Sequence, residues 1–164
     1  MRLKIPKALL RPRTGFSWLA MISPSASRLS LTDPALGTTG FPVFHRVIAT
    51  EKSEGSPLNK HSIVGVTNPK IIIIDDNSSY GLSLSQRIKT VASTGSILST
   101  ISVSAPTSGV FNWTTAVNTV RTSAASVVIY AGYYPQAATL YTQLRNAGYK
   151  GVLAGHLLDE VRLG

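Results

Sequence analysis

Two acidic side chains stand directly after a run of four isoleucines in this chain of 164 residues. Asp75 and Asp76 follow Ile71–Ile74 in the stretch KIIIIDDNSSYG. A hydrophobic strand that ends in an acidic pair is typical of a phosphorylation switch, in which the acids hold magnesium. The position equally suits a ligand cleft, because open α/β sheets bind small molecules in the loops at the carboxyl ends of their parallel strands.

A phosphorylation switch needs a further aspartate, the phosphate acceptor, at the end of a later strand in the same domain. Between Asp76 and Asp159 the chain has no aspartate or glutamate. The apolar run 126–132, SVVIYAG, is followed by Tyr133 instead of a carboxylate. These residues exclude the phosphorylation switch, so the ligand cleft remains as the interpretation of the acidic pair.

The sequence contains no motif for catalysis or for metal binding. It lacks the G-x-S-x-G elbow and the glycine-rich phosphate loops. His45, His61 and His156 stand apart from one another, and the chain has no cysteine. Asp75 and Asp76 are a poor acid–base pair because neighbouring side chains on an extended chain point to opposite sides; capping of the following helix is their structural interpretation. We expect no enzymatic activity, no cofactor and no metal.

Small hydroxyls and tyrosines occupy the loops where a cleft would form. Ser23, Ser25 and Ser27 follow an apolar segment. Tyr80 follows the acidic pair, and Tyr133–Tyr134 follow a second apolar run. Hydroxyls and exposed amides at strand ends can hold a carboxylate, while tyrosine faces suit an ammonium group or an apolar side chain. The same residue types also form ordinary turns, and composition alone does not separate the two interpretations.

The elements that must position these residues alternate between two patterns from residue 63 onward. Continuous β-branched runs predict strands buried on both faces, and apolar residues at helical spacing predict helices between them. The predicted strands are 71–74, 96–103, 126–132 and 151–155, and the predicted helices are 54–66, 82–92, 113–120 and 135–147, with a loop at 75–80. Upstream, 22–27 and 41–49 are predicted to be extended. The alternation predicts an α/β fold, a parallel sheet with flanking helices.

A formal net charge of +9 raises the alternative of a small basic nucleic-acid-binding protein. Residues 1–20 carry a net charge of +5 without any acid, and the remaining bases are scattered, with no basic helix face interleaved with aromatics. No apolar run reaches the roughly 18 to 20 residues of a membrane span. The basic start also lacks the long apolar core of a secretory signal peptide, so we expect residues 1–20 to be a disordered basic leader.

Five stretches occur in a fixed order between Met21 and Gly155: MISPSAS, LTD…GFPVFHRV, EGSPLNKHSI, IIIIDDNSSYG and VVIYAGYYPQAATLYTQLRNAGYKG. In this order they resemble the type I periplasmic binding proteins, specifically the branched-chain (Leu/Ile/Val-type) amino-acid substrate-binding proteins of ABC transporters. The last stretch is the most specific of the five. The resemblance implies a type I periplasmic-binding-protein-like lobe, mostly the second lobe with a piece of the first.

The resemblance also implies an extracytoplasmic, periplasmic protein whose two lobes close on an amino acid by a hinge motion and present it to a membrane permease. Ser25, Ala26 and Ser27 would hold the ligand's α-carboxylate and α-ammonium groups from the first lobe, with Ser27 supplying a hydroxyl. Tyr80 and Tyr133 would close over the ligand from the second lobe, with Tyr133 near the ammonium group. The implied ligand is leucine, isoleucine, valine or a similar amino acid.

Four parts of the chain follow from the resemblance. Residues 1–20 are the basic leader, 21–49 a first-lobe fragment with a hinge crossover, 50–155 the second-lobe α/β domain, and 156–164 a divergent tail. Family members are more than twice this long, so the chain resembles one truncated at both ends. We expect an intact second-lobe sheet, and weak or absent amino-acid binding because half a cleft cannot enclose a ligand.

Two alternatives to transport stay open. One is a ligand-sensing regulatory domain of the same fold. The other is the basic nucleic-acid-binding protein, whose binding would weaken with salt as phosphate contacts are lost.

Overall fold

The computed structural model describes residues 20–32, 44–93, 96–106 and 109–155. The chain divides into two compact units, Met1–Thr50 and Glu51–Gly164. The leader expected at 1–20 lies outside the described residues except for Ala20, and the tail expected at 156–164 lies wholly outside them. Within the described ranges, no helix is both long and apolar enough to cross a membrane.

The first unit is built on two short parallel strands. β1 spans Met21–Ser23, the 3-10 turn η2 spans Leu29–Leu31, and β2 spans Phe44–Arg46. Met21 pairs with Phe44, and Ser23 pairs with Arg46. The extended segment predicted at 22–27 ends as a strand at Ser23, because Pro24 has no N–H to donate to a ladder.

The second unit alternates helices and strands along the chain. Its elements are α1 (Glu51–Ser62), β3 (Ile71–Asp75), α2 (Ser79–Val91), β4 (Ile97–Ser102), α3 (Thr114–Thr122), β5 (Val127–Ala131), α4 (Tyr134–Asn146) and β6 (Val152–Gly155). The four strands form one sheet in the order β4-β3-β5-β6, and all its pairings are parallel. The prediction of an α/β fold with a parallel sheet and flanking helices is confirmed.

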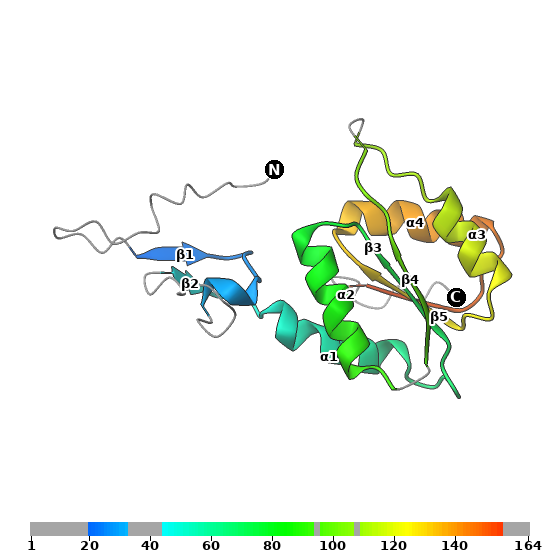
Figure 1. Ribbon diagram of the computed structural model, residues 1–164, viewed down its shortest axis with the longest axis horizontal. Helices are drawn as coiled ribbons and strands as arrows, with labels where there is room; N and C mark the ends of the chain where they lie inside the picture. The colour runs from blue at the N-terminus through cyan, green and yellow to red at the C-terminus, as the bar shows by residue number, and fades with distance from the viewer. Residues whose placement is uncertain (1–19, 33–43, 94–95, 107–108, 156–164) are drawn as a thin grey trace. The chain divides into compact units, whose positions relative to one another are not determined.

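Helices cover both faces of this sheet, as Figure 1 shows. Leu84 and Ile88 of α2 pack on one face, with Leu58 of α1 beside them. On the other face, residues of α3 and α4 pack around Trp113. The Trp113 indole donates a hydrogen bond to Thr139 of α4 at 3.0 Å, which ties the start of α3 to its neighbouring helix.

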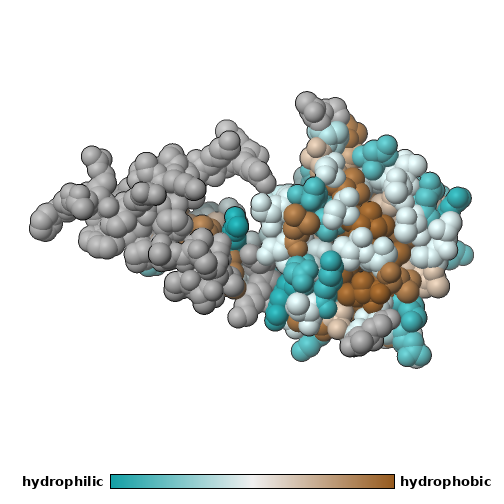
Figure 2. Space-filling model, in the orientation of Figure 1, coloured by the Kyte–Doolittle hydropathy of each residue, from teal (hydrophilic) through white to brown (hydrophobic). Residues whose placement is uncertain are grey.

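The two central strands are buried along their whole length. Every residue of β3 and of β5 is buried, from Ile71 to Asp75 and from Val127 to Ala131. Their five residues pair in continuous register. The outer strand β4 carries an irregularity opposite Ile71 and Ile72 and exposes Leu98, and apolar residues are visible on this side of the unit in Figure 2.

The predicted bounds of two helices are wrong. Helix α1 begins at Glu51 instead of Glu54 and ends at Ser62 instead of near Val66, because a turn follows at Gly65, which has a φ of +75°. Helix α2 begins at Ser79, so Tyr80 lies in its first turn and not in a loop. The residue that caps this helix is Ser78, whose hydroxyl accepts the Gly81 N–H at 2.9 Å.

Gly81 allows α2 to lie close to the end of β5. A Cβ atom at this position would meet the Asp76 carboxyl group and would lie 2.6 Å from the Ala131 carbonyl oxygen. We expect Gly81→Ala to lower the free energy of unfolding by about 1 to 2 kcal/mol, because the overpacking outweighs the gain in helix propensity. Chemical denaturation measures this change.

Gln86→Ala is the matched control, since Gln86 is an exposed residue of the same helix. It is expected to alter the free energy of unfolding by less than about 0.5 kcal/mol. A Gly81→Ala variant as stable as the native chain would contradict the close approach of α2 to β5.

Candidate functional site

The candidate site lies at the carboxyl ends of the parallel strands in the second unit. We use the term rim for residues 75–80 after β3, 103–104 after β4 and 132–134 after β5, together with Glu54 of α1. Two of its loops are joined by a side-chain hydrogen bond, because the Asn77 amide donates to the Ser104 hydroxyl at 2.8 Å. The rim is therefore a connected surface across three neighbouring strand ends.

The acidic pair forms the floor of the rim. Asp75 is fully buried and Asp76 is 6% exposed. The Asp75 Oδ1 atom accepts the Asn77 N–H at 3.1 Å, and the Asp76 Oδ1 atom accepts the Ser78 N–H at 3.0 Å. The two side chains thus fold the loop back on itself through successive turns. The helix-cap interpretation of the pair is wrong, because Ser78 takes that place and the acids hold the loop before it.

A buried tyrosine hydroxyl lies close to the acidic pair. Tyr130 of β5 is 1% exposed, and among the described atoms neither its hydroxyl nor the Asp75 Oδ2 atom has a hydrogen-bond partner. Burial, followed by the nearby charge of Asp76, raises the pKa of Tyr130 well above its ordinary value. The hydroxyl folds toward Gly132, where a Cβ atom would lie 2.5 Å away. Glycine at 132 therefore leaves space for Tyr130 beneath the rim.

Two tyrosines pack together at the rim. The ring centroids of Tyr80 and Tyr133 are 5.5 Å apart, with an angle of 36° between the ring planes. Tyr80 also donates a hydrogen bond from its hydroxyl to Glu54 Oε2 at 3.2 Å. Tyr133 is 52% exposed, so the pair presents an aromatic surface to solvent.

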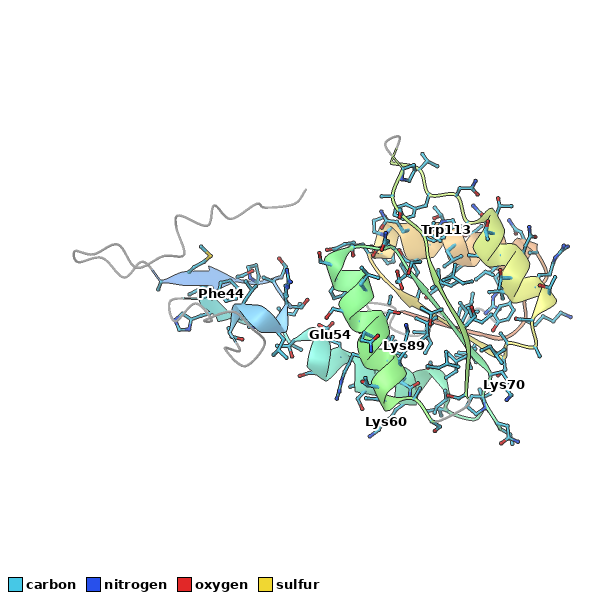
Figure 3. The ribbon with its side chains drawn as sticks, in the orientation of Figure 1. Phe44, Glu54, Lys60, Lys70, Lys89 and Trp113 are labelled. Carbon is cyan, nitrogen blue, oxygen red and sulfur yellow. The ribbon has the colours of Figure 1, made fainter. Side chains whose placement is uncertain are left out.

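Glu54 reaches the rim from a helix that precedes the whole sheet. Its side chain is 8% exposed, and Figure 3 labels it on α1, which packs beside α2. The sequence prediction did not include this residue, nor Tyr130 and Asn77. Glu54 and Asn77 contact partners distant in sequence, Tyr80 and Ser104, and Tyr130 lies within the buried strand β5. No local pattern therefore identifies them.

Ser25, Ala26 and Ser27 lie in the first unit, directly after β1. The Ser23 hydroxyl accepts the Ala26 N–H at 3.0 Å and the Ser25 N–H at 3.4 Å. Arg46 donates to the Ala26 carbonyl at 3.1 Å. Ser27 is buried and Ser25 is exposed. The Ser25 N–H and both backbone groups of Ala26 thus have partners inside this turn. In the second unit, the structure brings Tyr80 and Tyr133 together.

The rim combines an aromatic surface with acidic groups beneath it. Tyrosine faces attract cations such as an ammonium group and also cover apolar side chains. The acids Asp75, Asp76 and Glu54 add negative potential behind the rings, and this potential is strengthened by burial. Within the described part of the chain, no three His, Cys, Asp or Glu side chains group as metal ligands would. The arrangement suits a small cationic or zwitterionic molecule with an apolar part.

The sequence is similar to that of a protein from Brucella melitensis biotype 1 named Leu/Ile/Val-binding protein homolog 3, with 23% identity over 135 residues. The similarity covers 82% of this chain and 35% of the relative, so the chain spans about a third of the relative's length. No family model matches the chain. The relative's name describes a binding protein rather than an enzyme.

The hydrogen bond between Tyr80 and Glu54 can be tested by deleting one hydroxyl. We expect Tyr80→Phe to lower the free energy of unfolding by about 1 to 2 kcal/mol, because a buried acidic side chain loses a donor while the ring packing is kept. Tyr134→Phe deletes the same group from an exposed side chain and should change stability by less than about 0.5 kcal/mol. Equal stability of the two variants would contradict a structural role for this bond.

Proposed function

We propose that the chain is part of a solute-binding protein and that its rim holds an amino acid with an apolar, branched side chain. The observation that carries this proposal is the Tyr80–Tyr133 pair at the carboxyl ends of the strands, with buried acidic groups behind it. Open parallel sheets bind small molecules at this edge. The similarity to a Leu/Ile/Val-binding protein homolog supports the same class of ligand.

Each part of a zwitterionic amino acid has a matching group in this proposal. The ammonium group lies against the exposed face of Tyr133, where the negative potential of the acidic pair adds to the attraction of the ring. The aliphatic side chain covers Tyr80, whose orientation is fixed by the bond to Glu54. The carboxylate is assigned to Ser25, Ala26 and Ser27 of the first unit.

The proposal also assigns ligand contacts to three residues of the first unit. Ser25, Ala26 and Ser27 form a compact turn held by Ser23 and Arg46, and we assign to this turn the contacts with the ligand's carboxylate and ammonium groups. The division near Thr50 then separates a first-lobe fragment from a second lobe, with a hinge crossover near 44–47. The assembled protein acts outside the cytoplasm and delivers its ligand to the permease of an ABC transporter.

Titration calorimetry of the purified chain against leucine, isoleucine, valine and a set of polar amino acids tests this function. The rim alone covers one side of the ligand and leaves much of it solvated. We therefore expect saturable binding with a dissociation constant in roughly the millimolar range. Tyr133→Ala is expected to weaken it about tenfold, since a ring face is worth about 1 to 2 kcal/mol to a bound cation.

Tyr134→Ala is the matched control, because Tyr134 is an adjacent tyrosine with a similar exposed fraction, 54% against 52%, and the proposal assigns it no contact with the ligand. This variant should bind within about twofold of the native chain. A chain that unfolds cooperatively but binds none of these amino acids would contradict the proposed function. Equal effects of both tyrosine variants would place the ligand away from the Tyr80–Tyr133 pair.

A further inference from the structure

The second unit separates its acidic and basic side chains. Three of its acids are buried, with exposed fractions of 8% for Glu54, 0% for Asp75 and 6% for Asp76. All three belong to the rim. Lysines 60, 70, 89 and 150, in contrast, are exposed. Among the side chains whose exposure the structure describes, the solvent-facing charge of this unit is therefore mainly positive.

The bases gather at the end of the unit opposite the rim. We use the term basic end for a set of side chains in the last turns of the four helices or just before strands: Lys60, Lys70, Lys89, Arg121, Arg145 and Lys150. In a parallel sheet, each connecting helix runs back to the amino end of the next strand, so the helix ends and strand starts share one edge. Figure 3 labels Lys60 and Lys70 along the lower edge of the unit.

The helix dipoles offset only part of the positive charge of the basic end. Each helix carboxyl terminus carries about half a negative elementary charge, so four of them offset about two of the six bases. Arg145 donates hydrogen bonds to the carbonyl oxygens of Tyr149 and Gly151, which are uncharged acceptors. A substantial positive charge thus remains on the basic end.

An exposed aliphatic side chain projects from the same end. Val64 is 71% exposed and follows α1, between Lys60 and Lys70 in the chain. Its backbone is held in a turn, because Val64 N–H donates to the His61 carbonyl and Val66 N–H donates to the Ile63 carbonyl. The turn therefore holds the apolar side chain of Val64 between two lysines of the chain, Lys60 and Lys70.

We propose that the basic end docks onto an anionic lipid bilayer, with Val64 inserted among the headgroups. Bases that surround an apolar tip fit a bilayer interface, where lipid phosphates lie above hydrocarbon. A nucleic acid fits less well, because single strands stack on exposed aromatic rings. The exposed rings of this unit, Tyr133 and Tyr134, belong to the rim, and Tyr149 is partly buried beside Arg145. Docked this way, the rim faces away from the bilayer.

A fluorescent label at Val64 tests the docking geometry. The full chain has no cysteine, so Val64→Cys accepts a single polarity-sensitive fluorophore. Phosphatidylcholine vesicles with about a quarter phosphatidylglycerol should blue-shift and intensify the emission, and vesicles of phosphatidylcholine alone should not. Val110→Cys is the matched control, since Val110 is 74% exposed in the loop after β4, near the rim. Its labelled emission should stay unchanged.

A charge variant tests the bases themselves. In vesicle sedimentation, Lys60→Gln/Lys70→Gln/Lys89→Gln should lower the partition coefficient of the full chain about 100-fold, since each base near an anionic surface contributes about fivefold. Lys4→Gln/Lys7→Gln/Arg11→Gln removes the same charge from the first unit and should have a smaller effect. Both triple variants must keep the native unfolding transition.

Three results would overturn the proposal. The first is a label at Val64 that does not respond to anionic vesicles, or that responds no more than the label at Val110. The second is an equal loss of binding in the two triple variants, which would indicate attraction by net charge alone. The third is binding to a DNA duplex, without binding to vesicles, that Lys60→Gln/Lys70→Gln/Lys89→Gln abolishes. That result would assign the basic end to nucleic acid.

Discussion

The pairing of β3 with β5 is the constraint on which the second unit depends. Both strands are buried along their full length, and their continuous register sets residues of the two strands side by side, from Ile71 beside Val127 to Asp75 beside Ala131. A slip of one residue would turn each apolar side chain to the opposite face of the sheet. Because both faces are covered by helices, the pairing also fixes where the two strands end. The rim exists because these two ends lie together.

The end of this pairing is also where polar groups are brought into the core. Asp75 belongs to β3 and is fully buried, yet one of its oxygens has a backbone donor within the same loop. Tyr130 lies one residue before the end of β5, and Gly132 leaves space for its hydroxyl. Burial of acidic groups costs free energy unless they are hydrogen-bonded. Buried acids in the loop that leads to Tyr80 fit a ligand that carries a positive charge.

The distribution of charge gives the second unit two distinct ends. Acids at the rim and bases at the opposite edge produce a field along the strands, and it favours an ammonium group at one end and anions at the other. The helix dipoles have the opposite sense, since helix amino termini lie toward the rim. Side-chain charges therefore outweigh the backbone in setting the sign at each end. A binding protein that is oriented at a membrane would use the rim for its ligand and the basic end for the bilayer.

Sequence patterns predicted the elements of the second unit well, because its two central strands are continuous, mainly apolar runs and its helices repeat apolar residues at regular spacing. Tyr80 and Tyr133 were predicted as site residues in the loops after such runs, and their rings pack together; their contact with a ligand stays a prediction. The start of α2 was placed wrongly, since Asp75, Asp76 and Ser78 can all cap a helix and only their three-dimensional contacts decide which does. Glu54 was missed for a similar reason. It belongs to the rim through packing of α1 on α2, and no local pattern encodes that contact.

Amide chemical shifts of the isotopically labelled chain, followed by nuclear magnetic resonance during a leucine titration, test the central claim most directly. The account predicts saturable shifts at Tyr80, Gly132 and Tyr133, and none at Lys70 or Gly151 at the other end of the strands. Shifts confined to that other end, or no shifts in a folded chain at millimolar leucine, would contradict a ligand site at the rim.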